Sequence, residues 1–183
     1  INLLDTLLIS TPKPSANINI PTQADYRIQW ANFGNNPAVL YSVNYIIHYE
    51  EANLLDDEPE FEPKVIRWRL GEVRDESILS IPGIEFYKFM GSNLEKDEKY
   101  VRTFEYMDAE FVYSGEELVK YLDFINANTG ITSSQPIPPY TNLSEGLGLI
   151  AERNVQYVRN VFLSNSTVDS LRFGQFTKDL GFN

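Results

Sequence analysis

The sequence predicts a β-rich α+β fold, an antiparallel β-sandwich that carries two or three peripheral helices. Several segments alternate apolar and polar residues, which is typical of half-buried strands, and clusters of Gly, Asn and Pro separate them. The 183 residues include 11 Tyr and 11 Phe, and aromatic rings favour the pleated surface of a sheet. A hydrophobic content of 43% supports a packed core, and segments with helical spacing supply the helices.

Residues 1–20 are expected to form an N-terminal extension or a linker from a preceding module, and residues 21–183 the folded domain. Pro12 and Pro14 follow an apolar run, and proline cannot donate a hydrogen bond to a strand ladder. The apolar run itself, residues 3–9, could instead be a strand.

Two alternating segments give the strongest strand signal. In the first, apolar residues from Tyr26 to Trp30 occupy every second position, and residues 41–47 repeat the pattern. A turn at residues 32–37 joins the two segments, so we expect adjacent antiparallel strands. The pair resembles the middle of a fibronectin type III or immunoglobulin-like domain.

The next segment, residues 50–62, is strongly acidic and contains seven Asp and Glu residues. Calcium binds several carboxylate oxygens, so a calcium site is one interpretation. The segment lacks the spacing of an EF-hand loop, and a solvated loop between two strands is the favoured interpretation.

Three further strands and three helices complete the expected order. The strands cover residues 65–70, 100–113 and 153–163, with a polar connection at residues 71–80. The strand at 100–113 is expected to be two-sided or bulged, because neither of its faces is cleanly apolar. The helices begin near Pro82, Gly115 and Ser166, the last at a capping box. Gly146 and Gly148 are expected to let a strand lie tightly against another element.

The composition excludes several classes of function. The chain has no cysteine, which excludes disulfides, thiolate catalysis and the usual structural zinc sites. A net charge of −11 repels nucleic acid and anionic lipid. No nucleotide-binding, metalloprotease or serine-hydrolase motif occurs, so we expect no cofactor and no metal site.

We also expect no catalytic residue. His48 is the only histidine, and without a Ser or Cys elbow it is interpreted as a strand residue. Asp108 and Glu110 share a strand face and could form a glycosidase pair, but 26 acidic residues make such pairs common. Large amphipathic rings are the ligand-binding candidates, with burial in the core as the favoured alternative. These candidates are Trp30, Tyr45, Tyr49 and Trp68.

The segment Tyr140-Thr-Asn-Leu-Ser-Glu-Gly-Leu-Gly-Leu149, entered through a proline-rich approach, is similar to the closing segment of uncharacterised Bacteroidota cell-envelope lipoproteins. In that family a Tyr-Thr-Asn-(Ile/Leu)-x-x-Gly-(Leu/Phe)-Gly-(Ile/Leu) corner follows a fibronectin-like domain. The resemblance covers residues 20–153, although the family often places a Phe after the second glycine, where this chain has Leu149. It implies a non-catalytic accessory protein associated with the outer membrane, and it gives no catalytic residues to carry over. The family's lipid-bearing cysteine is absent, as expected of a fragment.

We therefore expect a cell-envelope binding or assembly module, periplasmic or surface-exposed, that contacts other envelope proteins or a glycan. Nucleic acid is not an expected partner, and a lipid anchor would belong to a longer form of the protein. Two alternatives stay open. One is a structural subunit of an outer-membrane transport or secretion complex, and the other is an envelope hydrolase that uses Asp108 and Glu110.

Overall fold

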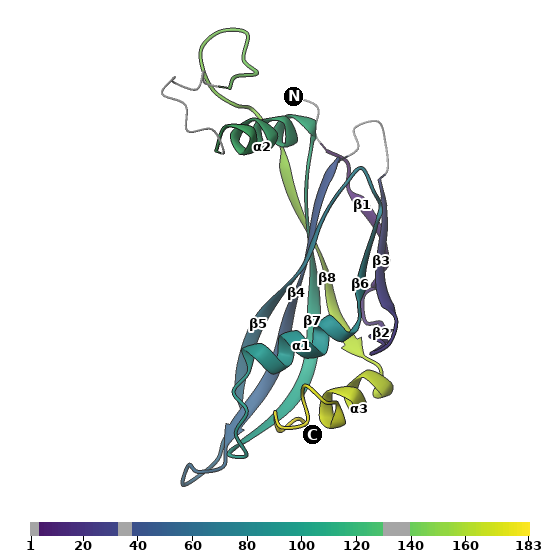
Figure 1. The fold of residues 1–183 in the computed structure, drawn as a ribbon, viewed down its shortest axis with the longest axis vertical. Coiled ribbons are helices and arrows are strands. Elements are labelled where there is room, and N and C mark those ends of the chain that lie inside the picture. Colours follow the sequence, from purple (N-terminus) through teal and green to yellow (C-terminus); the bar gives the residue numbers. More distant parts are fainter. Residues whose placement is uncertain (1–3, 33–37, 130–139) are drawn as a thin grey trace.

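The computed structural model describes residues 4–32, 38–129 and 140–183, which form two sheets and three helices. The strands are β1 (Leu7–Thr11), β2 (Asn17–Ile18), β3 (Asp25–Asn32), β4 (Leu40–Asn53), β5 (Glu62–Arg74), β6 (Ile78–Pro82), β7 (Tyr100–Ser114) and β8 (Arg153–Leu163). The helices are α1 (Ile84–Asn93), α2 (Glu116–Thr129) and α3 (Asn165–Phe173). The larger sheet has the order β2-β8-β7-β4-β5, and the smaller has the order β1-β3-β6. The long strands β4, β5 and β7 twist around one another along the length of the molecule (Figure 1).

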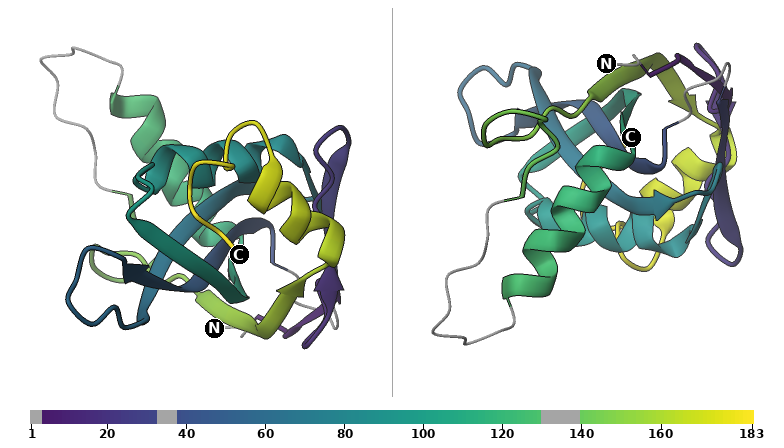
Figure 2. Two further views of the ribbon diagram at one scale, coloured as in Figure 1. Left: turned by 90° about the horizontal axis from the view of Figure 1, so that it is seen from below. Right: turned by 90° about the horizontal axis from the view of Figure 1, so that it is seen from above.

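Alternation of side chains gives the larger sheet one buried face and one open face. On β4 the side chains at odd positions from Tyr41 to Tyr49 are buried, and on β7 those from Met107 to Tyr113 are buried in the same way. The smaller sheet, α1 and α3 cover this buried face, whereas α2 lies at the other end of the molecule (Figure 1 and Figure 2). One apolar cluster therefore lies between the two sheets and two of the helices.

A pair of tyrosines joins the two sheets inside this core. The hydroxyl groups of Tyr26 on β3 and Tyr45 on β4 lie 2.6 Å apart, and the two rings are 6.3 Å apart. Burial raises the pKa of Tyr26 from 10.0 to about 12, and it raises the pKa of Tyr45 well above the ordinary value. Each hydroxyl thus has the other as its hydrogen-bond partner in a site that disfavours ionisation.

Arg102 attaches the C-terminal segment to β7. Its side chain is 1% exposed, and its Nε donates to the carboxylate of Glu51 at 2.6 Å. Its guanidinium also donates to the carbonyl of Leu180, and the backbone N–H of Asn183 donates to the carbonyl of Arg102 at 3.0 Å. A charge buried to this extent needs such partners, because leaving it unpaired would cost several kcal/mol.

The β-rich α+β class is confirmed, but one expected pairing is wrong. The two segments with the strongest strand signal form β3 and β4, which lie in different sheets. The turn expected at residues 32–37 falls mostly on residues 33–37, outside the described residues. Within residues 4–20, which were expected to belong to an N-terminal extension or linker, β1 pairs with β3 and β2 pairs with β8. Ile18 and Ile20 belong to the core.

Two local expectations near the C-terminus are also corrected. Gly146 and Gly148 lie in an irregular loop and not in a strand, and a Cβ on Gly146 would contact nothing within 4 Å. Their φ angles of 94° and 150° explain the glycines instead. Helix α3 begins one residue after Ser164, whose side chain accepts a hydrogen bond from the N–H of Thr167. The expected cap at Ser166 is therefore two residues too late.

Replacement of Tyr45 by Phe tests the link between the sheets. The single variant leaves the Tyr26 hydroxyl buried without its partner, so we expect a loss of about 1–3 kcal/mol in the free energy of unfolding. The double variant Tyr26→Phe/Tyr45→Phe removes both hydroxyls and should recover most of that loss. Urea unfolding of the three proteins at pH 8 measures the difference, and a double variant as unstable as the single one would contradict the interpretation.

The same pair predicts the alkaline behaviour. Because both pKa values are raised above that of an unfolded tyrosine, the unfolded chain releases its protons first, and stability falls as pH rises from about 10 towards 12. The double variant should lose less stability between pH 9 and pH 11 than the unchanged protein. Equal losses would mean that the pair does not titrate as its burial requires.

Candidate functional site

The structure places the four ligand-binding candidates in the core. Trp30, Tyr45, Tyr49 and Trp68 are all buried, with exposed fractions of no more than 6%. Trp30 packs against Phe111 at 5.7 Å between ring centres. These positions favour a role in packing, and the prediction that the rings bind a ligand stays a prediction. Of the four, Trp68 also lines a surface groove.

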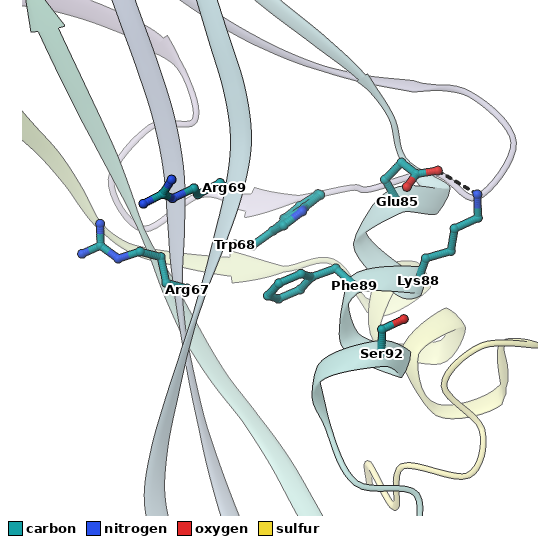
Figure 3. Close-up of a pocket in the computed structure, with 7 residues that line it drawn as sticks. All are labelled: Arg67, Trp68, Arg69, Glu85, Lys88, Phe89 and Ser92. Atoms are coloured by element: carbon teal, nitrogen blue, oxygen red, sulfur yellow. Dashed lines mark hydrogen bonds and ion pairs between the residues drawn. The ribbon is translucent and has the colours of Figure 1, made fainter. Parts of the chain in front are cut away.

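The groove lies between β5 and α1 and has a volume of about 550 Å³ (Figure 3). Trp68 of β5 and Phe89 of α1 form its apolar floor, with stacked rings 5.9 Å apart. Arg67 and Arg69 project to the side of β5 away from these two rings (Figure 3). The remaining lining residues come from α1 and are Glu85, Lys88 and Ser92.

Strand β5 is the last strand of the larger sheet. It pairs with β4 from residue 62 to residue 74, and no other strand in the described part of the chain pairs with it. In an edge strand, every second residue points its backbone N–H and C=O away from the sheet. The groove therefore combines unpaired backbone groups with an aromatic floor.

A close backbone contact positions α1 beside this strand. A Cβ on Gly83, at the start of α1, would lie only 2.0 Å from the carbonyl oxygen of Pro21, so glycine is required there. The N–H of Gly83 donates to the carbonyl of Ala24 at 3.0 Å, and the hydroxyl of Tyr87 donates to the carbonyl of Ile20 at 2.7 Å. The segment 20–24 thus fixes the wall of the groove.

The open face of the larger sheet carries the two acidic residues considered for catalysis. Glu110 is 6% exposed and accepts hydrogen bonds from Arg67, from Asn44 at 2.9 Å and from Tyr157 at 2.9 Å. Burial raises the pKa of the Glu110 carboxyl, but its three donors lower it by more, so its pKa lies below the ordinary value. A glycosidase acid needs a raised pKa, so this environment favours a structural role.

Asp108 occupies the same face two residues earlier. Its carboxylate pairs with Arg159 at 2.6 Å and accepts the backbone N–H of Asn160 at 3.1 Å. The Nε2 of His48 lies 3.5 Å away, and the ring of His48 stacks on Tyr106 at 4.3 Å. The structure therefore brings His48 and both carboxylates to one face, but it engages each carboxylate with an arginine.

The acidic segment at residues 50–62 lies partly in strands and partly in the loop between them. Glu50 and Glu51 belong to β4, and the following residues link β4 to β5, so the link between two strands is confirmed. Within residues 4–32, 38–129 and 140–183, no group of three or more His, Cys, Asp or Glu residues could hold a metal ion.

Comparison of the chain with protein-family models, curated proteins and solved structures gives no significant match. No helix in the described part of the chain is long and apolar enough to cross a membrane. Neither Phe89 nor the free edge of β5 is among the binding features predicted from the sequence. Apolar residues around residue 89 recur at helical spacing, so the sequence does predict a helix there. Nothing within residues 62–74, however, indicates that this strand lies at the edge of the sheet.

Glu110→Gln tests whether the buried carboxylate is structural. The variant keeps the shape of the side chain but weakens its bonds to Arg67 and Tyr157, so we expect a loss of about 1–3 kcal/mol at pH 7. Because the pKa of Glu110 is lowered in the folded state, its contribution is present above the unfolded value near 4.5 and is lost as pH falls below it. The variant and the unchanged protein should therefore converge in stability as pH falls through the lowered pKa of Glu110.

Urea unfolding between pH 3 and pH 7 measures this convergence. Glu105→Gln is the matched control, because Glu105 lies on the same strand and is exposed. A difference that stays constant across this range, or an equal loss in the control, would contradict the structural role of Glu110.

Proposed function

We propose that the protein is a non-catalytic binding module that takes up an extended segment of a partner protein by strand addition at β5. The observation that carries the proposal is the free edge of β5 beside a groove floored by Trp68 and Phe89. Strand addition is a common way to bind peptides, in which main-chain hydrogen bonds give affinity and side-chain pockets give specificity.

The groove suits the side chains of such a segment. An added strand projects alternate side chains to opposite faces, so every second residue would face α1. Phe89 is only partly buried and offers apolar contact to one of these residues. Lys88 and Glu85 pair with each other at 2.7 Å, so the α1 wall of the groove carries little net charge. We therefore propose a partner segment with an apolar or aromatic residue at the position that faces Phe89.

The burial of the aromatic rings favours a protein partner over a glycan. Rings that bind sugars present an exposed face for stacking, whereas Trp68 is 6% exposed and its ring packs against Phe86 and Phe89. Backbone hydrogen-bonding groups along β5 match a polypeptide better than a sugar ring. Glycan binding is an outcome that the experiment below can detect.

The setting of this module is also a proposal. The likeness of residues 130–150 to the closing segment of Bacteroidota envelope lipoproteins supports a place in the cell envelope, associated with the outer membrane. Two sheets around one core are compatible with a fibronectin- or immunoglobulin-like relationship, which we retain as part of the proposal. A hydrolase is not part of it, because arginines engage Asp108 and Glu110.

Selection of displayed peptides tests the proposed function. Random twelve-residue peptides selected on the immobilised protein should converge on segments with apolar residues at alternate positions. Phe89→Asp should weaken binding of a selected synthetic peptide by about ten-fold or more, because it places a charge on the apolar floor. Phe173→Asp is the matched control, since Phe173 is 74% exposed on α3. A glycan array probed with the same proteins tests the other class of ligand.

Backbone methylation of the peptide gives a readout that does not depend on the variants. N-methyl groups at every second residue should abolish binding, and the same groups shifted by one residue should be tolerated. Failure to enrich any peptide, equal binding by both methylated forms, or glycan binding without peptide binding would each contradict strand addition.

A further inference from the structure

We propose that a second site, on the open face of the larger sheet, binds a small amphipathic carboxylate. A cavity of about 440 Å³ lies there between the sheet and α2. This volume falls in the range of sites for small ligands. The site goes beyond the peptide groove: Arg67 and Arg69 border both, but the rest of the cavity is lined by the open face of the sheet and by α2.

Three arginines supply the positive charge of the cavity. Arg69 of β5 and Arg153 of β8 both line the cavity, and neither has an ion-pair partner among the described residues. The third arginine in the lining, Arg67, is already paired with Glu110. Glu72 is the remaining carboxylate of the lining. The cavity therefore carries a surplus of one positive charge in a chain of net charge −11.

A surplus of one positive charge in the cavity favours a ligand that carries a single negative charge. The planar fork of an arginine matches a carboxylate or phosphate through paired hydrogen bonds. A dianionic phosphate group would be repelled by Glu72 and would exceed the available positive charge. Ser42 and Ser114 also line the cavity, and a serine hydroxyl is a neutral hydrogen-bond donor.

The other wall of the cavity is apolar and incompletely covered. Leu118 and Leu122 of α2 line it together with Val112 of β7, and both leucines are only partly buried. An exposed ion pair between Arg74 and Asp123, at 2.7 Å, joins the end of β5 to α2. An apolar tail between α2 and the sheet would bury the remaining exposed surface of these leucines, at about 25 cal/mol per Å² of apolar surface.

Titration with sodium octanoate tests this site. Isothermal calorimetry should detect binding of octanoate to the unchanged protein, and ¹³C-methyl spectra should place its contacts at Leu118 and Leu122. Arg69→Gln and Arg153→Gln should each weaken binding by about ten-fold, and the double variant should abolish it. Arg27→Gln is the matched control, because Arg27 is exposed on β3 of the smaller sheet. Phe89→Asp should bind octanoate as the unchanged protein does.

Three comparison ligands fix the chemical class. Octanol lacks the charge, acetate lacks the tail, and inorganic phosphate carries a larger charge, so each should bind at least about ten-fold more weakly than octanoate. The proposal is overturned if octanoate does not bind or if both arginine variants bind it unchanged. The proposal is also overturned if octanol or phosphate binds as tightly as octanoate. Loss of octanoate binding in Phe89→Asp would overturn it as well, because octanoate would then occupy the peptide groove.

Discussion

Strand β4 is hydrogen-bonded along both of its edges, to β5 and to β7, and the rest of the structure depends on this constraint. A strand held on both sides can direct its side chains only to the two faces of the sheet, so one sequence of alternating residues determines both faces. The odd positions of β4 build the aromatic core, and the even positions build the polar open face. A shift of one residue in the pairing register of β4 would turn the aromatic residues to the open face and the polar residues to the core.

The two candidate binding surfaces follow from the same arrangement. Because β4 supplies the only strand partner of β5 in the described residues, the far edge of β5 keeps unpaired backbone groups. Because Asp108 and Glu110 are buried among the side chains of the open face, their carboxylates need compensation, and five of the eight arginines in the chain lie on this face. Two of these arginines, Arg69 and Arg153, have no ion-pair partner among the described residues. The peptide groove and the proposed carboxylate cavity thus meet at β5, where Arg67 and Arg69 border both.

Sequence reasoning reached the class of fold and most of its elements, because alternation and helical spacing are local properties. It found the strands around Tyr26, Tyr45 and Tyr106 and the helices α1 and α2. It missed β6, which it treated as part of a polar connection, because polar residues flank the short run from Ile78 to Ile81. It also assigned β3 and β4 to one sheet, since sheet membership depends on contacts between residues far apart in the sequence.

The candidate sites were less accessible to such reasoning. Trp68 was chosen for its ring, yet the groove also needs Phe89 from another element and the position of β5 at the end of the sheet.

The most direct measurement of whether the outer edge of β5 is free is amide hydrogen exchange along β4 and β5. The account predicts protection at all central positions of β4 but only at alternate positions from residue 64 to residue 70 of β5. Uniform protection across β5 would show that its outer edge is already covered, and it would contradict a free edge as the binding surface.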